Sequence, residues 1–294
     1  MPSLIDMRRR IRTVRNTQQI TKAMKMISAA RLRKSQERAF NARPYAGLLR
    51  ETLAGIASRS QGLKHPLLVE RPQERITVLV LTGDRGLCGA FNTNILRAVE
   101  RFLTEHSDKQ ITVVPIGRKG RDYVRRRGLN VEQEYTGIYA KLDYSNAKTI
   151  AAQLIADYTE AKTDAVYVIY NEFKSVISQK LTVAQLLPLQ SLSAAGESAD
   201  GSTSAEGSVQ IDYIYEQPPQ EMLDTLLPRN VEVQIYGALL ESIAAEHAAR
   251  MTAMDAATSS AGDMIDSLTL TMNRIRQAAI TKEIIEIVSG AAAI

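Results

Sequence analysis

The chain has 294 residues and a net charge of +5, with 45% apolar residues, 5% aromatic residues and no tryptophan. Its length allows one large or two ordinary domains. The single cysteine, Cys88, excludes an internal disulfide and a cysteine-based metal site, and fits a reducing cytosolic compartment. No run approaches the roughly 18 apolar residues that span a bilayer. We therefore expect a protein that is soluble, or at most peripheral to a membrane, with no secretory signal.

The positive charge is concentrated at the N-terminus. Residues 1–50 contain 13 Lys or Arg and two acids, a net charge of +11, so the other 244 residues carry −6. Basic character that belongs to one element marks a local partner surface. A nucleic acid, an anionic membrane and an acidic protein partner would each fit such a surface.

The first predicted element is a long helix within a segment 1–58. A heptad-like apolar seam begins at Leu4 and Met7 and becomes polar near residues 17–19. It is then expected to resume on a slightly rotated stripe at Ile20, Ala23 and Ile27. Some 50 helical residues would form a rod of about 75 Å. A single helix with one apolar stripe is unstable alone in water, so this helix needs a partner.

The middle zone, 70–215, changes to the pattern of an α/β domain. Short apolar runs at 75–82, 110–116, 165–171 and 209–215 are typical of strands, and 92–106 and 146–162 are typical of helices. This alternation predicts a Rossmann-like domain with a largely parallel sheet. The Ser/Gly/Ala tract 191–208 has little to bury and is expected to be a mobile loop.

The third zone, 220–294, predicts a second long helix. Pro228 is expected in its first turn. Ten of the fourteen heptad positions counted from Leu240 are apolar, and residues 231–294 carry eight acids against four bases. The economical solution pairs this helix with the oppositely charged N-terminal helix as a coiled coil. The α/β domain is then inserted between the two.

Two glycine-bounded stretches could in principle bind phosphate. Residues 81–92, LTGDRGLCGAFN, space their glycines as G-x-x-G-x-x-G, without the dinucleotide spacing and without the Walker lysine. We expect a tight turn that presents Asp84, Arg85 and Cys88 at a surface. The basic stretch 117–128 is expected to be a solvated helix face rather than a phosphate site. No catalytic, cofactor-binding or metal-binding arrangement is predicted.

Two further segments suggest contacts with other proteins. Tyr213 and Tyr215 alternate along one strand face, so they belong either to a half-buried core or to a docking surface. Residues 273–294 end in an apolar helix, although chain termini are normally polar. We therefore expect another protein to enclose this terminus.

Four stretches of the sequence together resemble a known family. The stretches IRTVRNTQQITKAMKMISAARLRKSQ, LTGDRGLCGAFN, EHAARMTAMDAATSSAGDMI and NRIRQAAITKEIIEIVSGAAAI are similar to the gamma subunit of bacterial F-type ATP synthases, from end to end and in order. The resemblance implies an antiparallel coiled coil inside a hexamer of three alpha and three beta subunits. The α/β domain would lie near the membrane ring. The chain would rotate as a unit, coupling ion flow to ATP synthesis or hydrolysis.

The resemblance also implies partners and site residues. The beta subunit would contact Met24, Lys25, Asp84, Arg85, Cys88, Arg276, Gln277 and Thr281. The membrane c-ring and the epsilon subunit would contact Tyr213, Tyr215 and Glu216, and an apical bearing would contain Ala291, Ala292, Ala293 and Ile294. The chain itself would be non-catalytic, without a cofactor, and peripheral on the cytoplasmic face of the plasma (inner) membrane.

Two alternatives remain from the residues alone. A basic coiled-coil nucleic-acid-binding protein would bind in a steeply salt-dependent manner, but aromatic residues for stacking are scarce. A nucleotide-dependent enzyme built on the middle domain would need a phosphate loop, which the glycine spacing does not provide.

Overall fold

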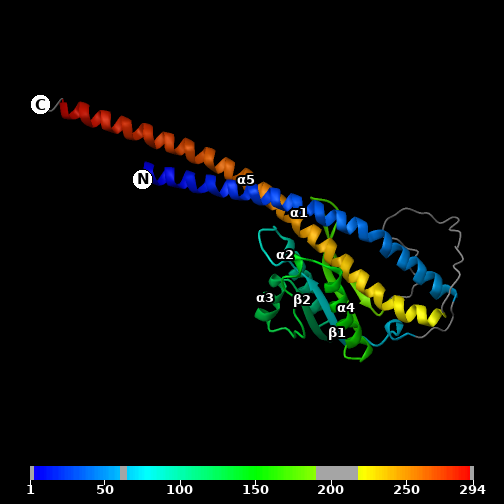
Figure 1. Cartoon of the computed structure of the whole chain (residues 1–294). Helices are drawn as coiled ribbons and strands as arrows, with labels where there is room; N and C mark the ends of the chain where they lie inside the picture. The colour runs from blue at the N-terminus through cyan, green and yellow to red at the C-terminus, as the bar shows by residue number, and fades with distance from the viewer. Residues whose placement is uncertain (1–2, 60–64, 190–217, 292–294) are drawn as a thin grey trace.

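The computed structural model describes residues 3–59, 65–189 and 218–291. Two long helices, α1 (Leu4–Arg59) and α5 (Pro219–Ala291), lie side by side and form a rod that projects from an α/β domain (Figure 1). Lys25 of α1 pairs with Asp255 of α5, whereas Arg43 pairs with Glu241. Residue numbers thus rise along one helix as they fall along the other. The predicted antiparallel coiled coil is confirmed.

The α/β domain is built on one four-stranded sheet. Its strands are β1 (Arg75–Leu81), β2 (Gln110–Ile116), β3 (Ala165–Phe173) and β4 (Gln179–Leu187), in the order β2-β1-β3-β4. β1 pairs in parallel with β2 and β3, and β4 is antiparallel to β3. The first three strands were predicted. The sequence analysis missed β4, because this partly exposed edge strand carries polar residues. The strand and loop predicted at 209–215 and 191–208 lie outside the described residues.

Helices cover both faces of the sheet. α2 (Phe91–Glu105) and α3 (Arg118–Arg127) lie on one face, and α4 (Tyr144–Thr159) and the first half of α5 lie on the other. The two-residue period of β1 explains this arrangement: Ile76 and Val78 point toward α2, whereas Leu79 and Leu81 point toward α4 and α5. Two short 3-10 helices, η1 (Pro66–Leu68) and η2 (Ile138–Ala140), complete the connections.

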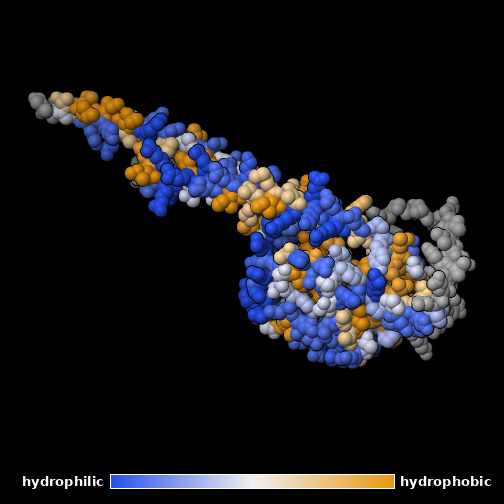
Figure 2. All heavy atoms as spheres, viewed as in Figure 1, coloured by the Kyte–Doolittle hydropathy of each residue, from blue (hydrophilic) through white to orange (hydrophobic). Residues whose placement is uncertain are grey.

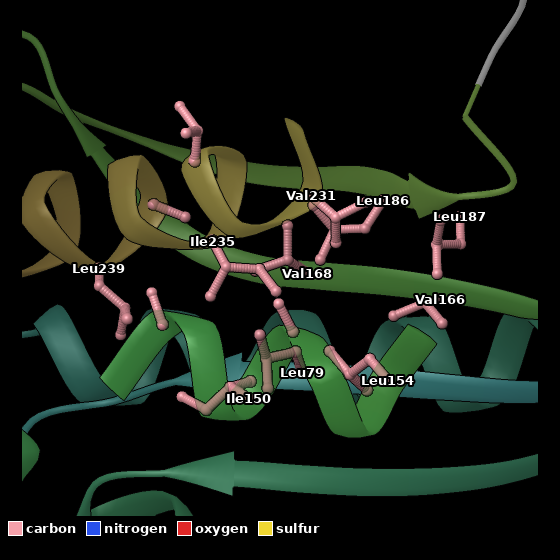
Figure 3. Close-up of a cluster of buried hydrophobic side chains, with 14 of the residues drawn as sticks. Leu79, Ile150, Leu154, Val166, Val168, Leu186, Leu187, Val231, Ile235 and Leu239 are labelled. Carbon is pink, nitrogen blue, oxygen red and sulfur yellow. The ribbon is translucent and has the colours of Figure 1, made fainter. Parts of the chain in front are cut away.

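The shaft and the domain share one hydrophobic core. Val231, Ile235 and Leu239 of α5 lie against Ile150 and Leu154 of α4 and against the sheet residues labelled in Figure 3. Each of these side chains contributes roughly 1.5–3 kcal/mol when fully buried. Because the same helix continues outward as the shaft, the domain cannot turn independently of the rod.

Two details of the helices differ from the prediction. α5 begins at Pro219, so Pro228 lies inside it rather than in its first turn. Leu223 and Leu227, buried within this first part, provide packing that offsets the hydrogen bond lost at the proline. In α5 the buried seam also lies one residue away from the predicted heptad position at Met264, and that side chain is 53% exposed.

The rotated stripe predicted on α1 is wrong. Ile20 and Ile27 are 60% and 54% exposed, and Ala23 is also exposed. The seam instead continues without rotation through Gln18 and Thr21, and a polar seam is stable here because each side chain finds a partner on α5 or on its own helix. Periodicity of apolar residues alone could not show this.

Candidate functional site: the shaft and its junction with the α/β domain

The middle of the coiled coil is held together by small polar side chains. Thr21, Ser28 and Ser35 of α1 are 8%, 3% and 8% exposed. The Thr258 hydroxyl lies 2.8 Å from that of Thr21, and Gln18 Nε2 donates to the Thr258 carbonyl oxygen at 3.4 Å. Small residues at these positions let the two helices approach closely. The result is a thin shaft with hydrogen bonds across its seam.

The basic face of α1 also contributes to the pairing. Lys25 Nζ lies 2.5 Å from a carboxylate oxygen of Asp255, and an Arg43 guanidinium nitrogen lies 3.0 Å from Glu241. Met24, beside Lys25, is half-buried. Lys25 was predicted to face another subunit, yet its charge is directed at α5 of its own chain.

α5 extends past the start of α1 as a single helix (Figure 1). Gln18 lies against Gly262, so an antiparallel register places Leu4 opposite a residue near Arg276. The residues from there to Ala291 form about 22 Å of unaccompanied helix. Gln277 and Thr281 are exposed on it, together with a group of large apolar side chains, namely Ile280, Ile284, Ile285, Ile287 and Val288. Figure 2 shows this apolar surface near the far end of the shaft.

The glycine-rich turn after β1 is occupied by the chain's own groups. The Gly83 N–H donates to Asn92 Oδ1 at 2.8 Å, and a Cβ at Gly83 would lie 2.9 Å from the Glu246 carboxylate. Asp84 accepts hydrogen bonds from the backbone N–H groups of Arg118 and Gly137 at 3.0 and 3.4 Å. The turn therefore anchors α3 and η2 instead of binding phosphate through its backbone.

Only part of this turn reaches the surface as predicted. Arg85 is exposed, but Cys88 is 2% exposed, so its predicted surface position is wrong. Burial, together with the Glu246 carboxylate, raises the pKa of the Cys88 thiol and keeps it protonated. The Cys88 side chain is enclosed because it packs with Phe91 of α2 in the hydrophobic core between the sheet and α2.

A buried ion pair joins the shaft to this turn. Glu246 and Arg250, one turn apart on α5, have side chains 8% and 9% exposed and are hydrogen-bonded to each other. Arg250 also donates to the Gly86 carbonyl oxygen at 3.4 Å, and its guanidinium lies 3.3 Å from His247 Nδ1. Burial raises the pKa of Glu246 despite Arg250, and burial with the adjacent arginines lowers that of His247 to about 4.

The sequence did not predict this pair. The heptad pattern counted from Leu240 places His247 and Arg250 among the seam positions and gives Glu246 no role. A signal was present, since a Glu and an Arg four residues apart interrupt an alanine-rich stretch of α5. That spacing alone cannot tell a buried pair from an exposed one.

The remaining predicted residues are distributed along the rod and beyond it. Arg276, Gln277, Thr281 and Ala291 are all exposed on the single-helix tip. Ala292, Ala293 and Ile294 lie outside the described residues, as do Tyr213, Tyr215 and Glu216. Among the described residues, those predicted to contact other subunits thus fall into a group near the junction and a group at the tip.

Comparison with known proteins decides the family. The sequence model of the ATP synthase family matches residues 3–294. The ATP synthase gamma chain of Solibacter usitatus is 55% identical over 100% of this chain and 99% of its own length, and that of an Anaeromyxobacter species is 50% identical over all of both. The chain belongs to the ATP synthase gamma family.

Solved structures agree with the family's fold. A chain of the Tetrahymena thermophila mitochondrial ATP synthase central stalk and c-ring has a TM-score of 0.60 and 26% identity, covering 81% of this chain and 99% of its own. A chain of the Euglena gracilis OSCP/F1/c-ring structure has a TM-score of 0.68 and 20% identity, covering 99% and 94%. The second similarity concerns the fold alone.

The described residues contain neither a membrane-spanning helix nor a group of metal-binding side chains. None of the helices in residues 3–59, 65–189 and 218–291 is long and apolar enough to cross a bilayer. In the same ranges, no three or more His, Cys, Asp or Glu side chains are grouped so that they could hold a metal ion.

Proposed function

We propose that the chain is the central rotor shaft of an ATP synthase and is itself non-catalytic, coupling ion flow through a membrane ring to ATP synthesis or hydrolysis by rotation. Membership of the gamma family supports this function. The observation that carries it is mechanical: α5 is part of the domain core and also forms the whole length of the shaft. A torque applied to the domain is therefore transmitted to the tip. The comparisons give no support to the nucleic-acid-binding alternative.

We place the shaft inside a hexamer of three alpha and three beta subunits, with the α/β domain against the epsilon subunit and the c-ring. The exposed isoleucines of the tip support this placement, because an unaccompanied apolar helix is stabilised when a surrounding protein removes it from water. Ala291, Ala292, Ala293 and Ile294 would form the end of this bearing. The c-ring side would include Tyr213, Tyr215 and Glu216. The assembly would be peripheral on the cytoplasmic face of the plasma (inner) membrane.

We assign two levels of contact with the beta subunits. Arg276, Gln277 and Thr281 form the upper level on the exposed tip. Met24 and Lys25 on α1, with Arg85 of the turn after β1, form the lower level. Asp84 and Cys88 act there indirectly, because one anchors α3 and the other is buried.

Rotation would change nucleotide affinity through differential contact. The shaft is asymmetric, with a single helix above and a helix pair below, so each orientation presents a different surface to each beta subunit. A ligand or partner shifts a conformational equilibrium only through different interactions with the two states. Lys and Arg heads on flexible stems attract an acidic surface without fixing one orientation. The nucleotide chemistry would belong to the beta subunits.

Native mass spectrometry of the tagged chain, solubilised from membranes and treated with nuclease, tests this function. We expect one copy with three copies each of two nucleotide-binding subunits. A free homodimer, or a mass that collapses on nuclease treatment, would contradict the rotor function. Residues Arg276 and Gln277 would then be replaced by alanine in the assembled enzyme to measure ATP turnover, with Lys282→Ala as an exposed control on the same helix.

A further inference from the structure

A basic cavity lies where the shaft meets the α/β domain. Its volume is about 630 Å³, and α1, the turn after β1, the start of α3, the η2 segment and α5 all line it. The lining contains seven cationic side chains and two acids. The cations are Arg31, Lys34, Arg38, Arg85, Arg118, Lys141 and Arg250. Of these seven, only Arg85 belongs to the proposed rotor contacts, and the coiled coil does not account for the other charges around the hollow.

The two acids offset only part of this charge. Glu246 is paired with Arg250, so these two cancel each other. Asp84 accepts the backbone N–H groups of Arg118 and Gly137 and lies at the N-terminus of α3, where it offsets the helix dipole. Six cationic side chains then face one carboxylate, Asp84, which leaves an excess of five positive charges around the cavity. The low pKa of the nearby His247, caused by burial and then by Arg250 and Arg31, is a second sign of a positive local potential.

An unused donor also lines the cavity. The Tyr139 hydroxyl is buried near Ser242 of α5, but no hydrogen bond of ordinary geometry joins it to the described residues. A buried polar group that is left unpaired costs about 1–3 kcal/mol, and an incoming acceptor would recover part of such a cost here. Burial raises the pKa of Tyr139 well above its usual value, so the hydroxyl keeps its proton and can donate it to an anion.

The cavity occupies the part of the fold where α/β sheets commonly bind ligands. Arg85 follows the carboxyl end of β1, and Arg118 follows that of β2. β1 has β2 on one side and β3 on the other, and their connections cover opposite faces of the sheet. Ligands of open α/β sheets bind outside the carboxyl ends at such a point of reversal.

We propose that this cavity binds a small phosphate-bearing anion, of the size of pyrophosphate or a nucleoside diphosphate. The volume lies within the range of small-molecule sites, roughly 300–1,000 Å³. Guanidinium groups match phosphate oxygens in geometry and charge, and the Tyr139 hydroxyl adds a neutral donor. Leu240 and Ile243 supply an apolar wall that could take a nucleoside. The site shares Arg85 with the proposed lower beta-subunit contact, but binding of the anion needs no other subunit and can be tested on the chain alone.

Isothermal titration of the full-length chain with pyrophosphate and with ADP tests the site. We expect saturable binding at one site, weakened at least about tenfold by Arg31→Gln, by Arg38→Gln and by Tyr139→Phe. The matched control is Arg33→Gln, because Arg33 lies on the opposite side of α1, is 85% exposed and pairs with Glu37. Its effect should stay within about twofold. Circular dichroism checks that each variant keeps the helices of the wild type.

The two probes also distinguish the source of the phosphate. Tighter binding of ADP than of pyrophosphate assigns the site to nucleotides, and equal binding assigns it to free phosphates; each supports the proposal. Absence of saturable binding by either probe overturns it. So does an equal loss in Arg33→Gln, which would indicate general charge attraction. Binding of an acidic peptide that pyrophosphate does not displace would also overturn it, assigning the surface to a protein partner.

Discussion

Replacing Glu246 by alanine should strongly destabilise the junction between shaft and domain. The variant leaves Arg250, whose side chain is 9% exposed, without its carboxylate partner. The bonds that remain to Gly86 and His247, at 3.4 and 3.3 Å, are long and cannot replace it. Removing one partner of a buried ion pair typically costs about 3–5 kcal/mol. That is a large fraction of the roughly 5–15 kcal/mol by which a domain is stable.

Urea unfolding followed by circular dichroism and tyrosine fluorescence measures this cost. The control is the double variant Glu246→Leu with Arg250→Met, which replaces the pair by apolar side chains of similar volume. We expect it to lie within about 1 kcal/mol of the wild type, because burying two charges is itself unfavourable. A loss below about 1 kcal/mol in Glu246→Ala would refute the reasoning. A double variant as unstable as the single one would refute it too.

Three other predictions concern separate parts of the chain. His247 has a pKa of about 4 in the folded chain against 6.5 when unfolded, so the unfolded chain binds a proton first as the pH falls. The free energy of unfolding of the wild type should therefore fall by about 2 kcal/mol between pH 7.5 and 5 because of this residue. Urea titrations at each pH should show that this part of the pH dependence is absent in His247→Gln. Gly117→Ala should prevent stable folding, because φ is +96° and a Cβ would lie 2.1 Å from a backbone oxygen. Gly128 has φ +63°, and no atom lies within 4 Å of the position that a Cβ would take, so Gly128→Ala should lower the free energy of unfolding by only about 1–2 kcal/mol. Similar melting temperatures for Gly117→Ala and Gly128→Ala would contradict this difference. The side chains of the Lys25–Asp255 pair are 37% and 60% exposed, so their coupling free energy for folding should be below about 1 kcal/mol. A double-mutant cycle with Lys25→Gln and Asp255→Asn measures it, and a coupling free energy twice as large would contradict the prediction.

The sequence predicts the architecture well because long helices and buried strands have strong periodic signals. The three parallel strands, the helices between them and the pairing of both terminal helices were all predicted. The edge strand β4 and the polar seam at Thr21 were not. In both, polar residues are satisfied by partners far away in the sequence, and a local pattern cannot show these.

The site was harder to predict for the same reason. The apolar end of α5 could be predicted, because the sequence shows apolar residues at the end of a helix, and these residues are exposed in the structure. The enclosure of Cys88 and the pairing of Glu246 with Arg250 depend on how α5 crosses the turn after β1. The basic cavity likewise combines residues from five segments. Only the fold brings them together.

Direct observation of rotation tests whether the chain turns as a rotor. Ile177, in the exposed turn between β3 and β4, is 90% exposed and can be replaced by cysteine to attach a visible probe, while Cys88 is buried. The labelled chain would be assembled with alpha and beta subunits fixed to a surface, and ATP added. We expect unidirectional rotation of the probe in three steps per turn. A probe that stays fixed while the complex hydrolyses ATP would contradict it.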